Sequence, residues 1–147
     1  MRGLRRSRKP AFRSAWKKRQ FCLNPVLGFF EPNFESGKAV RWQIRRADEQ
    51  PFALAGLREW RRQDDGRELR SLTMPTVNAT GHPLMSRFHA PNDEKGSVVY
   101  VPPEDYPGWL RADSDEDARS YLKLMDPDEF EGVPDPAPPR KRQSTQL

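Results

Sequence analysis

Hydrophobic residues in this chain come in short runs, separated by polar stretches rich in proline and glycine. AVRWQI, residues 39–44, alternates apolar positions with Arg41 and Gln43, which predicts a strand with one buried face. PFALAGL, residues 51–57, is continuously apolar, which is typical of a strand buried on both faces. The pattern favours a sheet-rich protein over a helical bundle.

The other apolar segments predict further strands and a few short helices. Strands are predicted at residues 21–30, interrupted at Asn24-Pro25, at 72–77 and at 97–102. A polar loop is expected at residues 61–70, around Asp65-Gly66. Short helices are predicted at residues 10–20, at 84–88, from Pro103 to Leu110, and after a cap at Asp113 or Ser114, in a helix that holds Tyr121, Leu122 and Met125. The predicted fold class is α+β, β-rich with a few short helices.

Length and composition refine this picture. The chain has 147 residues, enough for one domain, and its 15 prolines are about twice the usual share. We expect a basic N-terminal segment at residues 1–8 and a folded domain at 9–130. Residues 131–147 are rich in proline, then basic, and are expected to be a disordered tail.

The net charge is +5, and it is unevenly spread. Residues 1–20 carry nine Lys or Arg and no acid, whereas residues 104–131 carry ten acids against three bases. Three interpretations of the basic segment stay open: a solvated terminus, a phosphate-facing surface, or a mitochondrial presequence.

Cysteine and histidine are scarce. Cys22 is the single cysteine, which excludes an intrachain disulfide and favours a reducing compartment. With only two histidines besides, we expect no metal site and no cofactor. No apolar run is long enough to span a membrane, so no membrane association is expected.

The stretch GFFEPNFE, residues 28–35, places Glu31 among aromatic residues and a proline. Two interpretations are open: a strand-end residue turned to water, or a carboxylate held dry for chemistry. In the second case burial would disfavour the charged form, which suits proton exchange near neutral pH.

Several segments taken together resemble the SOS-response-associated peptidase (SRAP) family of abasic-site DNA–protein crosslinking proteins. They are PAFRSAW, FCLNPVLGFFEPNFESGKAVRW, PFALAGLREW, TMPTVNATGHPLMSRFHAPNDEK and VVYVPPEDYPGWL. The resemblance runs from about Lys9 to Leu110, the last two-thirds of a family domain, and implies a β-rich sheet or barrel core that lacks the N-terminal third.

The resemblance also implies a function. Family members bind single-stranded DNA at an abasic site, and an N-terminal cysteine forms a thiazolidine crosslink with the sugar aldehyde. They also have autopeptidase activity, and they belong to the SOS response to DNA damage. Glu31 matches the family's catalytic glutamate, and His89 in RFHAP matches its histidine. A bacterial, cytoplasmic, DNA-associated monomer is implied.

The chain departs from the family at the nucleophile. Arg2 stands where the family has its cysteine, and Cys22 matches a structural strand position, so we expect it to be a core residue. The leading hypothesis is a truncated SRAP protein that keeps Glu31 and His89 but forms no crosslink. The alternatives are an inactive nucleic-acid-binding remnant and a sequence that begins downstream of the true start of an active enzyme.

Further residues are candidates for contacts to DNA. Family members carry a phosphate-binding arginine where this chain has Gly96-Ser97, which leaves Lys95 as the nearest base. Trp42, Trp60 and Trp109 are expected in the core, although an aromatic residue beside an arginine, such as Trp42 beside Arg41, could stack on a base. The candidate DNA-binding residues are Arg2, Arg41, Arg45, Lys95 and Trp42.

Overall fold

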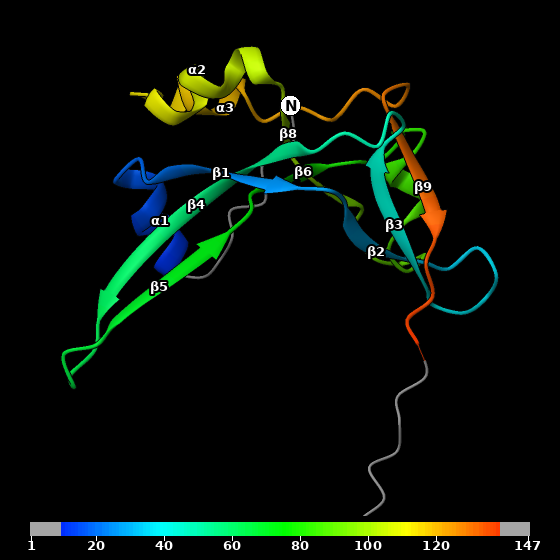
Figure 1. Cartoon of the computed structure of the whole chain (residues 1–147), viewed down its shortest axis with the longest axis horizontal. Coiled ribbons are helices and arrows are strands. Elements are labelled where there is room, and N and C mark those ends of the chain that lie inside the picture. The colour runs from blue at the N-terminus through cyan, green and yellow to red at the C-terminus, as the bar shows by residue number, and fades with distance from the viewer. Residues whose placement is uncertain (1–9, 139–147) are drawn as a thin grey trace, which may run out of the picture.

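The computed structural model describes residues 10–138 (Figure 1). The helices are α1 (Pro10–Lys17), the 3-10 turns η1 (Met85–Arg87) and η2 (Pro103–Asp105), α2 (Tyr106–Arg111) and α3 (Asp115–Ser120). The strands are β1 (Phe21–Val26), β2 (Phe29–Asn33), β3 (Val40–Arg46), β4 (Phe52–Arg62), β5 (Glu68–Thr73), β6 (Thr76–Asn78), β7 (Gly96–Val98), β8 (Tyr100–Val101) and β9 (Phe130–Pro134). This confirms the predicted α+β class.

Strand β4 is the centre of the largest sheet, in which every pairing is antiparallel. β1 runs along one edge of its first half, at Phe52–Leu57. β8 and β5 follow one another along β4, at Ala53–Leu54 and at Leu57–Arg62 respectively. The first half of β4 is therefore paired on both edges and covered on both faces.

The side chains of β4 alternate between two hydrophobic clusters, as the period of a strand requires. Phe52 and Leu54 belong to one cluster, together with Ile44 and Phe88. Ala55 and Leu57 belong to the other, where Trp109 is fully buried. The continuous apolar run at 51–57 thus fills two cores, which confirms the prediction of a strand buried on both faces.

A second sheet, with strand order β2-β3-β9, lies at the other end of the molecule from the helices α1, α2 and α3 (Figure 1). β3 is its central strand, and both pairings are antiparallel. β6 and β7 form a separate two-stranded pair. The β2-β3-β9 sheet and the segment before β7 position the candidate site.

The predicted strand at 21–30 is divided in two, at Leu27-Gly28 and not at Asn24-Pro25. Pro25 lies inside β1, which pairs with β4 alone among the described strands; proline is tolerated in an edge strand. Gly28 permits a close approach of the β1–β2 connection to β3, since a Cβ there would lie 2.9 Å from the carbonyl oxygen of Ile44.

The predicted loop at 61–70 is wrong, because β4 and β5 form a long hairpin with a short turn around Gly66. Backbone pairing holds its outer half, where most side chains are exposed, so the hydrophobic pattern carried no signal there. The predicted strand at 72–77 is divided at Met74-Pro75, since proline cannot donate a ladder hydrogen bond.

The predicted tail was placed too early. Residues 130–134 form β9, which pairs with β3 from Trp42 to Arg46, while residues 139–147 lie outside the described part of the chain. The last helix is shorter than predicted. Ser114 caps it by accepting a hydrogen bond from the Asp117 N–H, and it ends before Tyr121.

The three tryptophans that were expected in the core differ in burial. Trp109 is fully buried and Trp42 is partly buried. Trp60 is 53% exposed on the β4–β5 hairpin, where the Arg70 guanidinium lies over its ring at 4.4 Å. The expectation was therefore wrong for Trp60, because the hairpin extends beyond the helices that cover the first half of β4 (Figure 1).

Candidate active site

Glu31 lies in the middle of β2, directly opposite Trp42 on β3. Strand alternation places its side chain on the same face as Phe29, which packs on Phe52, and as the buried Asn33. The Glu31 side chain is only 19% exposed. Burial raises the pKa of Glu31 above its ordinary value, and a smaller opposing effect comes from the nearby His89.

His89 follows the η1 turn, and its backbone is in the left-handed region with φ of 71°. Its N–H donates to the carbonyl of Pro32 at 3.1 Å, and the preceding Phe88 forms a β-bridge with Asn33. The loop is therefore bound to β2 at the two residues that follow Glu31. This attachment brings the two sequence-predicted catalytic residues together.

The Nε2 atom of His89 lies 3.9 Å from Oε2 of Glu31. The same nitrogen lies 2.9 Å from the carbonyl oxygen of Gly96. Because a carbonyl oxygen only accepts, Nε2 must carry a proton. A half-buried imidazole with a fixed N–H beside a carboxyl group that holds its proton more readily than usual is an arrangement suited to general acid–base chemistry.

A shallow hollow of about 320 Å³ is lined by Phe30, Glu31, Pro32, Ala39 and Arg41. Phe30 and Pro32 alternate with Glu31 along β2, and Arg41 is opposite Pro32, so these side chains lie on the other face of the sheet. The hollow is therefore behind the Glu31–His89 pair and not the place where the carboxyl group and the imidazole meet.

The predicted DNA-binding arginines of β3 are engaged with acidic partners. Arg41 contacts Asp135 through both its backbone oxygen, at 2.7 Å, and its carboxylate, at 3.3 Å. Arg45 contacts Glu131 at 2.9 Å and Glu49 at 3.4 Å. Asp135 and Glu131 come from the segment that was expected to be disordered, so the sequence offered no sign of this neutralisation.

The remaining DNA-binding candidates have different surroundings. Trp42 is covered by the Arg87 guanidinium at 4.9 Å from its ring and packs edge-on against Phe88 at 6.0 Å. The Lys95 ammonium lies among backbone carbonyl oxygens of the His89 loop. Arg2 lies outside the described residues. The structure thus brings Lys95 and Trp42 to the Glu31–His89 pair, but as parts of its support.

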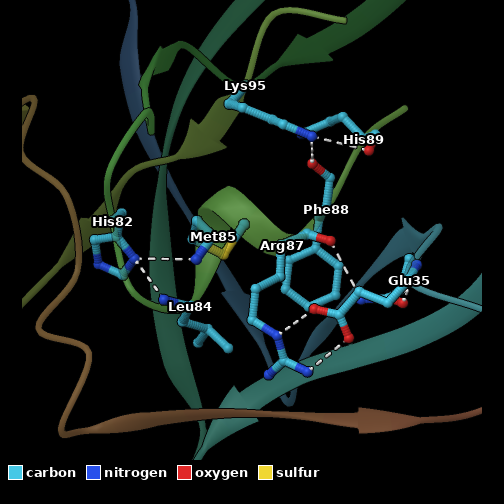
Figure 2. A network of polar contacts seen from close by, with 9 residues as sticks. Glu35, His82, Leu84, Met85, Arg87, Phe88, His89 and Lys95 are labelled. Carbon is cyan, nitrogen blue, oxygen red and sulfur yellow. Dashed lines mark hydrogen bonds and ion pairs between the residues drawn. The ribbon is translucent and has the colours of Figure 1, made fainter. Parts of the chain in front are cut away.

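Two supporting contacts were not identified from the sequence (Figure 2). Arg87 donates to both carboxylate oxygens of Glu35, at 2.8 and 3.1 Å, beside the site. The side-chain amide of Asn33 donates to the Arg87 carbonyl at 3.2 Å. Asparagine is common in turns, and this preference did not indicate that Asn33 would be buried or that its side chain would join β2 to η1.

His82 is a buried histidine that holds the start of η1 in place. Its Nδ1 accepts hydrogen bonds from the N–H groups of Leu84 and Met85 at the start of η1 (Figure 2). Its Nε2 donates to the carbonyl of Met125 at 2.7 Å. Both ring nitrogens are thus occupied, and His82 fixes the segment that leads to His89.

Cys22 is a half-buried thiol in β1. Burial raises its pKa, which the nearby Arg58 offsets only in part. Since the thiolate is the nucleophilic form, this position is unfavourable for attack on an aldehyde.

Residues 10–138 contain neither a cluster of metal-ligating side chains nor a helix that could span a membrane. Within that range no three or more His, Cys, Asp or Glu side chains gather as a metal site would require. None of the helices described in it has the length and apolar character to cross a membrane.

Glu31→Gln is expected to raise the free energy of unfolding near pH 7 but not near pH 4. Because burial raises the pKa of Glu31 above its ordinary 4.5, ionising this group costs more in the folded state than in the unfolded state. That cost is absent below the ordinary pKa, grows as the pH rises toward the raised pKa, and persists above it. Urea unfolding of both proteins across this pH range measures it; a difference that does not change with pH would contradict the buried carboxylate.

Fold and site together define a class of protein: a small α+β domain in which a glutamate and a histidine lie within 3.9 Å of each other beside an antiparallel sheet. The SOS response associated peptidase (SRAP) family profile matches residues 4–134. The chain therefore belongs to the SRAP family. A search of curated proteins found no match.

Solved structures agree with this assignment. A protein from Bordetella bronchiseptica superimposes with a TM-score of 0.83 and 35% identity, over 88% of this chain and 61% of that one. A phage-related protein from the same organism gives a TM-score of 0.56 and 26% identity, over 78% and 53%. A Bacteroides thetaiotaomicron protein, at 23% identity and TM-score 0.71, shows the same fold over 86% and 53%. The chain thus spans between about half and three-fifths of these proteins' lengths.

Proposed function

We propose that this protein binds single-stranded DNA at abasic sites, as a cytoplasmic monomer, and that Glu31 and His89 move protons on the lesion's deoxyribose. The observation that carries the proposal is the meeting of the two family-motif residues, with Nε2 and Oε2 at 3.9 Å on a half-buried surface. Family membership supports the association with DNA damage.

The chemistry required is the opening and closing of the sugar ring. At an abasic site the C1′–O4′ bond of the hemiacetal breaks as C1′=O forms, the anomeric hydroxyl loses a proton, and the ring oxygen gains one. In this proposal His89 protonates the ring oxygen and Glu31 accepts the hydroxyl proton, with the reverse transfers on closure. A carboxyl group whose pKa is raised by burial is a better match to this exchange near neutral pH.

The proposal for this 147-residue chain does not include a covalent crosslink. The single thiol of these 147 residues, Cys22, lies in a strand where burial raises its pKa. Cys22 does not combine a free α-amine with a thiolate, which a thiazolidine requires. Binding is therefore expected to be reversible.

The test compares two fluorescent single-stranded oligonucleotides that differ only by one central abasic site. Fluorescence anisotropy is expected to show at least about tenfold tighter binding of the abasic strand, because its aldehyde engages the Glu31–His89 pair. A heat-denatured gel of the same mixture is expected to show no shifted band. Equal affinities would contradict lesion recognition, and a heat-stable band would contradict reversible binding.

A second candidate function is binding of nucleic acid without regard to the lesion. The observation in its favour is the exposure of Arg13, Lys17 and Lys18 in and after α1, within the strongly basic start of the chain. Such binding would weaken steeply with salt and be equal for abasic and intact strands. The anisotropy series, repeated at several salt concentrations, separates the two functions.

A further inference from the structure

The side chain of Lys95 ends in a ring of backbone carbonyls. Its Nζ atom donates to the oxygens of Phe88 at 2.9 Å and His89 at 3.0 Å (Figure 2), and to the oxygen of Ala90 at 3.4 Å. An ammonium group has three N–H donors, so these contacts occupy all of them. Lys95 therefore binds the backbone of three consecutive residues, 88–90, in the loop that carries the His89 imidazole.

The conformation of this loop needs such support. His89 has a φ of 71°, in the left-handed region where a side chain with a Cβ is disfavoured. The turn also directs three carbonyl oxygens toward one point, where they would repel each other without a cation. The Lys95 ammonium offsets both costs, and it acts on the backbone of His89 itself.

Lys95 directly precedes strand β7, whose first residue, Gly96, orients the imidazole of His89. The carbonyl of Gly96, the next residue, accepts the hydrogen bond from His89 Nε2 at 2.9 Å. The carbonyl of Lys95 accepts a hydrogen bond from the N–H of Ala79 at 3.0 Å, next to the β6–β7 pair. Backbone and ring of His89 are thus held by two adjacent residues whose own position is fixed.

We propose that Lys95 is a positioning residue: it binds the carbonyls of residues 88–90, keeps His89 in its left-handed turn, and so sets Nε2 opposite Glu31. Its effect on catalysis rests on the proposed function, whereas its effect on the loop does not. This assignment replaces the phosphate contact expected from the sequence, because a half-buried ammonium with three internal acceptors has no donor left for DNA.

Lys95→Met and Lys95→Arg test the proposal, with the exposed Lys123→Met as matched control. Methionine keeps the length and loses the charge; arginine keeps the charge, but its planar fork cannot direct three donors at converging carbonyls as an ammonium does. Amide hydrogen exchange is measured at His89, whose N–H donates to Pro32, and at Ala55, whose N–H donates to Val99 in the core. The second measurement is the rate at which an alkoxyamine captures the aldehyde of bound abasic DNA, at saturating protein and at several salt concentrations.

Both variants are expected to exchange His89 at least about tenfold faster with Ala55 unchanged, since local opening becomes easier without global unfolding. Aldehyde capture at saturation is expected to slow by between about tenfold and a hundredfold, as misplaced catalytic groups do. The salt dependence of binding is expected to match that of the wild-type protein. Lys123→Met should change none of these.

Three outcomes would overturn the proposal. One is unchanged His89 exchange in both variants. Another is full activity in Lys95→Arg, and the third is a salt slope in Lys95→Met that is shallower by about 0.7, which marks a lost phosphate contact on a single strand. If the wild-type protein does not accelerate aldehyde capture, the proposed function fails, and the exchange measurement still decides the role of Lys95.

Discussion

Replacing Trp109 with alanine is expected to lower the free energy of unfolding by about 3–5 kcal/mol. The indole is fully buried, with its ring centroid 4.5 Å from that of Phe21 and 6.4 Å from that of Trp16. Its Nε1 donates to the carbonyl of Cys22 at 2.9 Å, so the substitution removes a hydrogen bond as well as the packing that joins α1, β1 and α2. Urea unfolding followed by circular dichroism measures the loss.

Trp60→Ala is the matched control for this substitution. Trp60 is 53% exposed, and the Arg70 guanidinium lies over its ring. Its replacement is therefore expected to lower the free energy of unfolding by no more than about 0.5 kcal/mol. Equal losses for the two variants would contradict the placement of Trp109 at the centre of a core and of Trp60 outside one.

The two tryptophans also illustrate what the sequence could predict about the fold. The pattern in residues 51–57 predicted a doubly buried strand, since each of its faces fills one hydrophobic cluster. The outer half of β4 was not predictable from side-chain pattern, because it is held by backbone pairing with β5 while its residues are largely exposed. Trp60 lies in that half, and its environment depends on how far the neighbouring helices reach.

The candidate site was predictable in its principal residues but not in its support. Glu31 and His89 could be found because they match a family motif. The contacts that bring them together are made by backbone carbonyl groups, as in the hydrogen bond from His89 to Pro32 and the hydrogen bond from Lys95 to His89. The positions of carbonyl groups cannot be inferred from the composition of the chain or from the spacing of its residues.

The acidic partners of the β3 arginines were not predicted, for a related reason. Arg41 and Arg45 suggest a basic strand when their neighbours in space are unknown. Their partners Asp135 and Glu131 come from β9 and the residue that follows it, a proline-rich segment whose composition is typical of a disordered tail. The segment pairs with β3 through its backbone and begins at Phe130, which is buried in the core, and the sequence pattern indicated neither contact.

Glu31→Gln is expected to reduce the rate of aldehyde capture from bound abasic DNA by about a hundredfold, the lower range for loss of a general acid–base group. Glutamine keeps the shape of the side chain but cannot exchange a proton at Oε2, which lies 3.9 Å from Nε2 of His89. Binding is expected to change less than the rate, because the proton transfer is needed only as the ring opens.

Two further variants define the origin of the effect. Glu116→Gln, an exposed glutamate in α3, is the matched control and should leave the rate unchanged. His89→Gln should slow capture to a similar extent, and the double variant with Glu31→Gln should be little slower than either single variant, because residues that act as a unit are not additive.

The most direct test of the Glu31–His89 pair is therefore the capture rate at saturating protein, with alkoxyamine in sufficient excess that ring opening limits the reaction. The wild-type protein is expected to accelerate capture over free abasic DNA, and Glu31→Gln, still folded and still bound, is expected to lose this acceleration. Equal rates for wild-type protein and Glu31→Gln would contradict the proposed proton-transfer role of Glu31.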